Sequence, residues 1–229
     1  MMEKLKIAVC DDEAGDLAQL IALLGEYDTE CMLDMRVYSG AGELLKAEGV
    51  DIVLIDIEMP APNGFEAAKK LKARKDPPVI IFTTKSNAYA VKGYGVAIRY
   101  LQKPLQEKPF FEAMDAAIGE AIAHRLTFEV NETTYALRLC QITHIEIYGH
   151  YASIHAEGEV YRIRSTMKEI AAKLPRGSFG IPHKSYAVNL EHVRSVTNSE
   201  ILLDNGIRIP VSRRKAAEFN QVLYRFLGR

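Results

Sequence analysis

The feature that most constrains the fold of this chain is a regular alternation over its first 123 residues, in which short apolar runs are followed by helical patterns. The apolar runs are four to seven residues long, as buried strands are, and the stretches between them repeat apolar residues at steps of three and four. Such an alternation predicts a parallel sheet that is covered by helices. We therefore expect an α/β domain of the doubly wound (βα)5 type.

Five strands and five helices are expected in this region. The strands are predicted at residues 6–9, 32–38, 51–55, 79–82 and 98–101. The helices are predicted at residues 14–27, 41–47, 65–74, 88–93 and 106–123, with Ser39 as the N-cap of the second. In a sheet of this kind, groups that bind ligands gather at the carboxyl ends of the strands, beside the point where the strand order reverses.

The chain changes character after Arg125. Alternating patterns predict strands at 133–138, 142–147, 151–155 and 159–163, and helical patterns follow at 166–174 and 212–227. The pair Asn205-Gly206 lies between two short apolar runs and predicts a hairpin with a type I′ turn. Because no Pro-, Gly- or Ser-rich linker separates the two parts, we expect two adjoining domains, residues 1–123 and residues 124–229, the second rich in strands.

The net charge of -1 conceals an asymmetry between the two parts. Residues 1–122 carry 14 Lys and Arg against 20 Asp and Glu, whereas residues 123–229 carry 15 against 10 and contain all six histidines. Opposite charge on the two parts predicts two tasks. The acidic part is expected to handle a metal or a phosphate, and the basic part to contact an anionic partner.

Cysteine content and hydropathy limit where the protein works. No stretch approaches the roughly 18 uninterrupted apolar residues of a membrane span, and the first residues lack the apolar core of a signal peptide. Cys10, Cys31 and Cys140 are odd in number and lack the spacing of metal ligands, which argues against disulfides and zinc. We expect a cytoplasmic protein without a membrane partner, whose cysteines are buried as small hydrophobes.

Carboxylates follow two of the predicted strands of the acidic part. Asp11 and Asp12 come directly after the first strand, and Asp56 ends the third. These three side chains are expected to converge at one edge of the sheet, where their mutual repulsion favours a bound cation. Oxygen ligands favour Mg²⁺ or Mn²⁺, and one Asp then remains free to act as a nucleophile.

A hydroxyl and an ammonium follow the next two strands. Thr83 and Thr84 end the fourth strand, and Lys103 and Pro104 follow the fifth. These groups suit the remaining oxygens of a transferred phosphoryl group. The sequence therefore predicts a site in the acidic part that accepts a phosphoryl group.

Over residues 4–123 the chain resembles the receiver domain of bacterial two-component response regulators. The matching elements are C-D-D-E at 10–13, D-I-E-M-P from 56 with Gly64 after it, Thr84, and L-Q-K-P at 101–104. The resemblance implies that Asp56 accepts a phosphoryl group from a sensor histidine kinase. It also implies that Asp11 and Asp12 hold Mg²⁺ together with Asp56 and the backbone carbonyl of Glu58.

The same resemblance assigns roles to residues at the ends of the fourth and fifth strands. It implies that Thr84 and Lys103 bind the phosphoryl group, that Thr84 and Tyr100 form a switch, and that the Lys103–Pro104 bond is cis. Lys85 is a departure, because the family usually has a small residue at this border of the pocket. We expect Lys85 to slow hydrolysis of the phosphoryl group or to restrict access to it.

The basic part shows no nucleophile and base at a recognisable spacing, such as G-x-S-x-G or H-E-x-x-H, so a binding role is favoured. Its basic residues concentrate at residues 183–186 and 213–215. Residues 203–229 carry six Lys and Arg against two Asp and Glu. This charge is typical of a surface that binds phosphates.

Over about residues 125–228 the chain resembles the LytTR DNA-binding domain. The matching runs are I-E-I-Y-G-H-Y at 145–151, S-T-M-K-E-I-A-A-K-L at 165–174, F-G-I-P-H-K-S-Y-A-V-N-L at 179–190 and N-G-I-R-I-P-V-S-R-R at 205–214. The family inserts loops, not a recognition helix, into successive major grooves. The resemblance implies that base edges are read by His150, Lys184 and Arg213. Phosphate contacts are implied for His183, Ser185, Tyr186, Arg214 and Lys215.

Ile181-Pro182 departs from this family, because many members place a basic residue just before the histidine, and we expect DNA affinity or preference to differ accordingly. The combined hypothesis is a response regulator transcription factor. Phosphorylation of Asp56 then favours a homodimer or frees the LytTR domain, and occupancy of promoter DNA rises. We expect no enzymatic activity beyond slow self-dephosphorylation.

Two alternatives remain from the sequence. The basic domain could bind RNA or protein in place of double-stranded DNA. The chain could also be an aspartyl-phosphate hydrolase of the haloacid dehalogenase type, which uses Asp and Mg²⁺ as well. That enzyme needs D-x-D-x-T after its first strand, and residues 10–13 do not offer this spacing.

Overall fold

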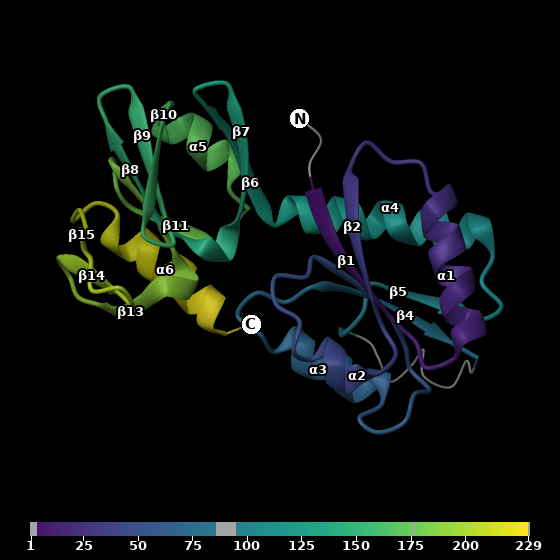
Figure 1. The fold of residues 1–229 in the computed structure, drawn as a ribbon. Helices are drawn as coiled ribbons and strands as arrows, with labels where there is room; N and C mark the ends of the chain where they lie inside the picture. Colours follow the sequence, from purple (N-terminus) through teal and green to yellow (C-terminus); the bar gives the residue numbers. More distant parts are fainter. Residues whose placement is uncertain (1–3, 86–94, 176, 229) are drawn as a thin grey trace. The chain divides into compact units, whose positions relative to one another are not determined.

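The computed structural model describes residues 4–85, 95–175 and 177–228, and the chain divides into two compact units, Met1–Ile122 and Ala123–Arg229 (Figure 1). The helix predicted at 88–93 lies outside the described residues. No helix in the described ranges is long and apolar enough to cross a membrane. Each unit has its own hydrophobic cores and is considered separately.

The first unit contains a parallel sheet of five strands with order β2-β1-β3-β4-β5. In chain order its elements are β1 (Lys4–Cys10), α1 (Ala14–Glu26), β2 (Met32–Tyr38), α2 (Ala41–Leu44), β3 (Ile52–Asp56), α3 (Gly64–Lys72), β4 (Val79–Thr84), β5 (Arg99–Gln102) and α4 (Glu107–Ala123). The predicted doubly wound α/β fold is confirmed. Strand order reverses at β1, which lies between β2 and β3, so the carboxyl ends of β1 and β3 flank the usual ligand position.

Helices cover both faces of this sheet, which explains why β3 and β4 are buried along their whole length. One core packs α1 and α4 against the sheet through side chains such as Leu20 and Phe110. The other packs α2 and α3 through side chains such as Leu44 and Leu71. The central strands are thereby held rigidly, and only their ends reach the surface.

Three local expectations need correction, two of them for α2 and one for the cysteines of both units. Gly40, not Ser39, is the N-cap of α2, and it makes no side-chain capping bond. The helix ends at Leu44 because the next amides bond three residues back, from Lys46 to the carbonyl of Glu43 and onward, which tightens the turn. Among the cysteines only Cys10 is buried, since Cys31 and Cys140 lie in segments that flank strands and are partly exposed.

The second unit is rich in strands, as predicted, and forms sheets with the orders β10-β9-β8-β12-β11, β13-β14-β15 and β6-β7. Its strands are β6 (Arg125–Val130), β7 (Thr133–Arg138), β8 (Ile142–Tyr148), β9 (Tyr151–Ala156), β10 (Glu159–Arg164), β11 (Phe179–His183), β12 (Tyr186–Asn189), β13 (Val193–Val196), β14 (Glu200–Leu203) and β15 (Arg208–Pro210). Its helices are η2 (Leu139–Gln141), α5 (Met167–Lys173), η3 (Leu190–His192) and α6 (Ala216–Leu227).

Two cores hold this unit together. The first lies between the five-stranded sheet, β6 and α5, and the second between the three-stranded sheet and α6. Phe219 of α6 packs so tightly on β11 that a Cβ added to Gly180 would lie 2.4 Å from the Phe219 ring. A residue larger than glycine at this position would clash with the Phe219 ring unless that ring moved.

Side chains from η3 and the end of β12 join the two cores. Asn189 Nδ2 donates to the carbonyls of Leu139 and Ile142, at 2.9 Å each. The ring nitrogens of His192 lie 2.8 Å from a carboxylate oxygen of Asp204 and 2.7 Å from the carbonyl of Cys140. The three-stranded sheet is thereby tied to the start of β8.

The hairpin predicted between β14 and β15 is present, but its turn is not of type I′. Only Gly206 has positive φ (85°), and the Gly206 amide donates to the Leu203 carbonyl at 3.0 Å. This is a type I turn with a glycine bulge, which a third loop residue, Asp204, makes room for. Type I′ geometry instead occurs at Asn131 and Glu132, with φ of 49° and 64°.

Candidate functional site

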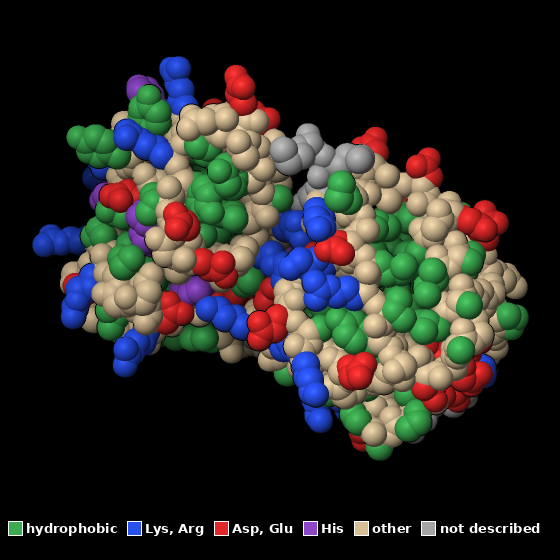
Figure 2. All heavy atoms as spheres, viewed as in Figure 1, with side chains coloured by type: hydrophobic (Ala, Val, Ile, Leu, Met, Phe, Trp, Pro, Cys, Tyr) green, Lys and Arg blue, Asp and Glu red, His purple; other side chains and the backbone are tan. Residues whose placement is uncertain are grey.

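The three predicted carboxylates lie together at the switch point of the first unit. Asp11 and Asp12 follow β1 and Asp56 ends β3, and each offers an oxygen within 4.8 Å of the others. Asp11 and Asp56 are buried, whereas Asp12 is exposed. Acidic side chains are visible at the surface of this unit in Figure 2. The sequence predicted that these residues lie together, because the carboxyl ends of neighbouring parallel strands share one edge of the sheet.

Gly64 fixes how closely the backbone approaches the site. A Cβ at this position would lie 1.7 Å from the backbone oxygen of Asp56. The Gly64 amide donates to the Ile57 carbonyl at 3.2 Å, and α3 begins there with Asn63 as its N-cap. The glycine that follows the D-I-E-M-P run is therefore required for α3 to begin against the end of β3.

Lys103 brings an ammonium into the carboxylate cluster. The Lys103–Pro104 peptide bond is cis, as predicted. Its Nζ lies 2.8 Å from Asp11 Oδ2, 2.8 Å from Asp16 Oδ2 and 3.2 Å from Asp56 Oδ2. Asp16 was not predicted as a site residue. Its position in the first turn of α1, four residues after Asp12, is the signal that could have identified it.

Burial and ion pairing act in opposite directions on these groups. Burial raises the pKa of Asp56, and the Lys103 charge only partly opposes this. Burial lowers the pKa of Lys103, but its hydrogen bonds to Asp11 and Asp16 outweigh burial and raise the pKa above the ordinary lysine value. The lysine is therefore firmly cationic.

The cluster suits a small divalent cation. Asp56 Oδ1 is buried and has no hydrogen-bond partner among the described residues, so it is left to face a ligand. Carboxylate oxygens are the donors that Mg²⁺ and Mn²⁺ prefer. The role predicted for the Glu58 carbonyl stays a prediction. The Glu58 side chain accepts the backbone amide of Lys85 at 3.0 Å.

Thr84 and Tyr100 lie on neighbouring strands of the same sheet. Thr84 is buried at the end of β4, with its hydroxyl 3.5 Å from Glu58 Oε2. The Tyr100 ring packs 5.3 Å from Phe82, centroid to centroid, and its buried hydroxyl has no hydrogen-bond partner in the described ranges. Their predicted switch role stays a prediction.

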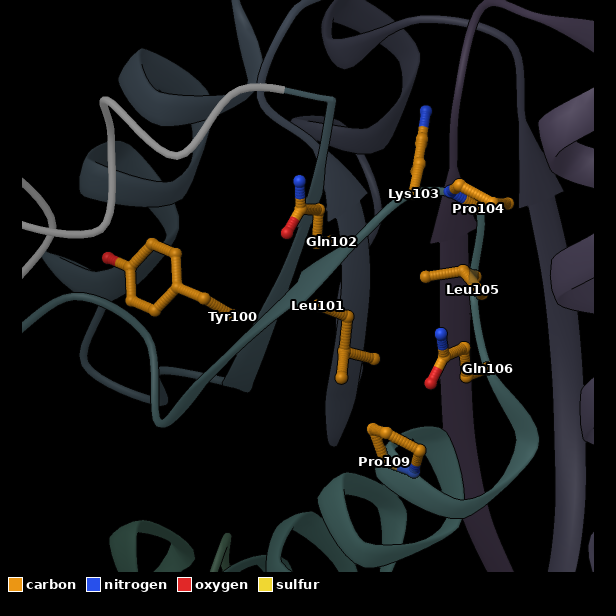
Figure 3. Close-up of a pocket in the computed structure, with 8 residues that line it drawn as sticks. All are labelled: Tyr100, Leu101, Gln102, Lys103, Pro104, Leu105, Gln106 and Pro109. Atoms are coloured by element: carbon orange, nitrogen blue, oxygen red, sulfur yellow. The ribbon is translucent and has the colours of Figure 1, made fainter.

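The backbone that carries Lys103 also lines a cavity of about 330 Å³. Figure 3 shows Lys103 and Tyr100 pointing to different sides of this segment. The cavity is bordered by residues 100–106 and by Pro109 at the start of α4. In the segment after β5, the Lys103 side chain therefore faces the carboxylates, while the backbone lies beside the cavity.

Lys85 lies at the rim of the carboxylate cluster. Its Nζ is 2.6 Å from Glu13 Oε1 and 3.4 Å from Asp16 Oδ2. The sequence predicted that Lys85 borders the pocket and that it slows hydrolysis or restricts access, and this effect stays a prediction. The structure identifies its partners.

In the second unit, the predicted DNA contacts fall on turns at one end of the five-stranded sheet. His150 is exposed in the turn between β8 and β9, and Lys184 is exposed in the turn between β11 and β12. Because Tyr186 pairs with Glu146 in antiparallel register, both turns lie at the same end. Figure 2 shows His, Lys and Arg side chains projecting from this unit.

The turn that contains Arg213 joins the same region. Arg213 and Arg214 are exposed, and the neighbouring Ser212 amide donates to the Pro182 carbonyl at 2.9 Å. The expectation that α6 begins at residue 212 was wrong, because the Lys215 amide bonds back to Ser212 in a turn and the helix starts at Ala216. The three basic residues therefore precede the helix and do not open it.

Three of the residues predicted to contact phosphates, His183, Tyr186 and Lys215, already have polar partners within the second unit. The Ser185 amide donates to His183 Nδ1 at 3.2 Å, so the proton of a neutral His183 ring resides on Nε2, where it can be donated. The Tyr186 hydroxyl donates to Glu146 at 2.7 Å, which raises its pKa. Lys215 pairs with Glu218 at 2.7 Å.

Comparison with known protein families matches both units. A model of the response regulator receiver domain matches residues 7–115, and a model of the LytTR DNA-binding domain matches residues 132–224. The chain belongs to the response regulators that carry a LytTR DNA-binding domain. This domain pair indicates a regulator, not an enzyme.

Relatives align with this response regulator over nearly its whole length. The "Sensory transduction protein LytT" of Bacillus subtilis (strain 168) is 26% identical, over 96% of this chain and 99% of the relative. The "Transcriptional regulatory protein LytR" of Staphylococcus aureus (strain MW2) is 25% identical, over 94% and 97%. The response regulatory domain of protein mrkE from Klebsiella pneumoniae matches 51% of this chain and 98% of its own, at 21% identity and TM-score 0.47.

Proposed function

We propose that this response regulator accepts a phosphoryl group on Asp56 from a sensor histidine kinase. The phosphoryl group then controls binding of double-stranded promoter DNA by the second domain. The receiver comprises residues 1–123 and the DNA-binding domain residues 124–229. The observation that carries the proposal is the buried Lys103 ammonium beside Asp11 and Asp56, with Asp56 Oδ1 left without a hydrogen-bond partner in the part of the chain that the structure describes.

In this proposal the pocket residues act as nucleophile, as phosphoryl ligands and as metal ligands. Asp56 is the nucleophile, and Lys103 and the Thr84 hydroxyl hold oxygens of the incoming phosphoryl group. Asp11, Asp12, Asp56 and the Glu58 carbonyl are suited to hold Mg²⁺ or Mn²⁺. A divalent cation supplies positive charge that offsets the charge of the phosphoryl oxygens. Slow self-dephosphorylation returns the receiver to its resting state.

The turns of the second unit supply the DNA contacts. His150, Lys184 and Arg213 are the base readers in this proposal, and the neighbouring basic and hydroxyl residues hold phosphates. Phosphorylation favours a homodimer or frees the second domain, and DNA occupancy rises. The name of the Staphylococcus aureus relative, a transcriptional regulatory protein, supports a role in transcription.

Intact-mass measurement tests the phosphoacceptor. The full chain is incubated with Mg²⁺ and acetyl phosphate, and a mass increase of one phosphoryl group is expected. Asp56→Asn should abolish the increase. An increase that persists in Asp56→Asn would overturn the assignment.

Binding titrations test the output. Duplex fragments selected from the host genome should bind with strong salt dependence and better than single-stranded RNA of the same length. Phosphorylated wild type should bind more tightly than Asp56→Asn under the same conditions. Preference for the RNA would favour an RNA-binding regulator instead.

A further inference from the structure

The Lys103 ammonium is crowded by carboxylates and donates a hydrogen bond to Asp16 Oδ2 at 2.8 Å. An ammonium carries three N–H groups, and three carboxylates lie within reach of Lys103 Nζ. Two of them, Asp11 and Asp56, are almost fully buried. The third, Asp16, has 23% of its side chain exposed.

Asp16 also contacts a second cation, Lys85. Lys85 Nζ lies 3.4 Å from the same Asp16 oxygen that contacts Lys103, and 2.6 Å from Glu13. The charges therefore alternate from the interior to the surface, in the order Asp56, Lys103, Asp16, Lys85 and Glu13.

Phosphorylation upsets this arrangement. With acetyl phosphate, a bond forms between an Asp56 carboxylate oxygen and phosphorus, and the bond from phosphorus to the acetate oxygen breaks. Acetate leaves with that electron pair. The Asp56 carboxylate, with one negative charge, becomes an acyl phosphate with about two, and its oxygens need donors. Because Lys103 Nζ already lies within 3.2 Å of three carboxylates, it must weaken one of these contacts to reach a phosphoryl oxygen.

Asp16 is the carboxylate that Lys103 can release most easily. Asp11 is buried, so water cannot replace the Lys103 contact that it would lose, whereas Asp16 lies at the rim and keeps Lys85. We propose that Asp16 and Lys85 are positioning residues of the phosphorylation site. Asp16 holds Lys103 in the unphosphorylated protein, and Lys85 takes over Asp16 when Lys103 turns to the phosphoryl group. This inference rests on the proposed function.

The two residues should act with opposite sign. Asp16→Asn removes the competitor for Lys103, so the acetyl phosphate concentration that gives half-maximal phosphorylation should fall about twofold to tenfold. Lys85→Gln leaves Asp16 with Lys103 as its remaining strong cation, so that concentration should rise by a similar factor. Because Lys85 acts through Asp16, the double variant should behave like Asp16→Asn alone. Asp16→Glu, which keeps the charge, should restore much of the wild-type behaviour.

A measurement on the unphosphorylated full chain tests the resting contact directly. The Lys103 ammonium, assigned by its loss in Lys103→Arg, should give a ¹⁵N signal with slow hydrogen exchange in the wild type without Mg²⁺. Exchange should accelerate in Asp16→Asn. A control removes the same charge elsewhere: Asp34→Asn breaks a 3.0 Å pair with Lys4 on the β1–β2 surface and should change neither measurement.

The outcomes separate this inference from the proposed function. Suppose that the wild type is phosphorylated, but Asp16→Asn changes neither the half-maximal acetyl phosphate concentration nor the exchange of the Lys103 ammonium. This result overturns the role of Asp16 and leaves the proposed function intact. Additive effects in the double variant overturn the role of Lys85 through Asp16. A wild type that takes no phosphoryl group on Asp56 overturns the proposed function itself.

Discussion

In the first unit the charged side chains face one another in a buried pocket, whereas in the second unit they project from turns at the surface. Lys103 contacts three carboxylates and is 7% exposed. His150, Lys184 and Arg213 are exposed. A buried charge that loses its partner destabilises the fold, whereas an exposed charge is solvated and remains available to bind a partner molecule.

The difference predicts how the two sites respond to change. Removing one charged side chain of the pocket leaves another charge buried without a partner, which lowers the free energy of unfolding. Removing one exposed charge leaves the fold intact and weakens only the binding that it shares with its neighbours.

The largest effect is expected for Lys103→Ala, which leaves Asp11, Asp16 and Asp56 facing one another without the ammonium. The free energy of unfolding of the first unit should fall by about 3–5 kcal/mol at neutral pH in the absence of Mg²⁺. Added Mg²⁺ should recover part of the loss, because a cation again faces the carboxylates. Urea unfolding of the full chain measures both, with Lys4→Ala as the exposed control. Equal stability of the two variants would contradict the comparison.

A stacked pair of histidines in the second unit, with His144 buried and His155 partly buried, provides a further test of how a buried group responds. His144 and His155 stack with ring centroids 4.0 Å apart, and burial together with His155 lowers the pKa of His144 from 6.5 to about 4. Between these values the unfolded chain binds a proton that the folded chain does not. Stability should therefore fall as pH decreases through this window, by on the order of 2–3 kcal/mol.

Hydrogen exchange of the β8 and β9 amides between pH 7 and pH 4.5 measures this loss. His144→Phe keeps an aromatic ring beside His155 and removes the titrating group, so the acid-induced loss should shrink. His150→Gln, in an exposed turn, should keep the wild-type pH dependence. An unchanged pH dependence in His144→Phe would show that His144 is not the responsible group.

Arg213 and Arg214 sharpen the comparison within the exposed site. Arg213→Ala should cost about 1–3 kcal/mol of binding on the preferred duplex and relax selectivity at one base pair. Arg214→Ala should weaken binding about equally on preferred and scrambled duplexes and lower the salt slope by about one. Titrations of both duplexes at two or more salt concentrations separate these patterns. Wild-type affinity of Arg213→Ala on every duplex would remove Arg213 from the site.

The smallest effect is expected for Lys215, because Glu218 already neutralises its ammonium at 2.7 Å. Lys215→Ala should weaken DNA binding by less than about 1 kcal/mol. Glu218→Ala should instead tighten binding slightly, since it frees Lys215 for a phosphate. The same titrations measure both, and a Lys215→Ala loss as large as that of Arg213→Ala would contradict this ranking.

The sequence predicted the pocket better than its rim. Asp11, Asp56 and Lys103 end or follow strands of the parallel sheet, so the strand pattern alone places them at one edge. The contacts of Asp16 and Lys85 depend on helix phase and on the reach of long side chains, which no local pattern encodes. Their ion pairs became visible only in three dimensions.

Turn geometry was the least predictable part of the second unit. Asn205-Gly206 favours a type I′ turn, but the pairing of Leu203 with Ile207 leaves three residues in the loop and selects another turn. The start of α6 was placed too early because residues 212–215 continue the helical spacing of the sequence while their amides form a turn.

The bonds of Asn189, His192 and Ser212 have a consequence for the DNA sites that this protein can use. Asn189 holds the end of β12 against β8, and His192 ties Asp204 after β14 to the segment before β8. Ser212 ties the Arg213 turn to β11, so the distance between the proposed groove-reading turns is fixed. One inserted base pair moves the next contact by about 3.4 Å and rotates it by about 34°. We therefore expect each operator half to tolerate base changes at single positions better than a single insertion between the contacted segments.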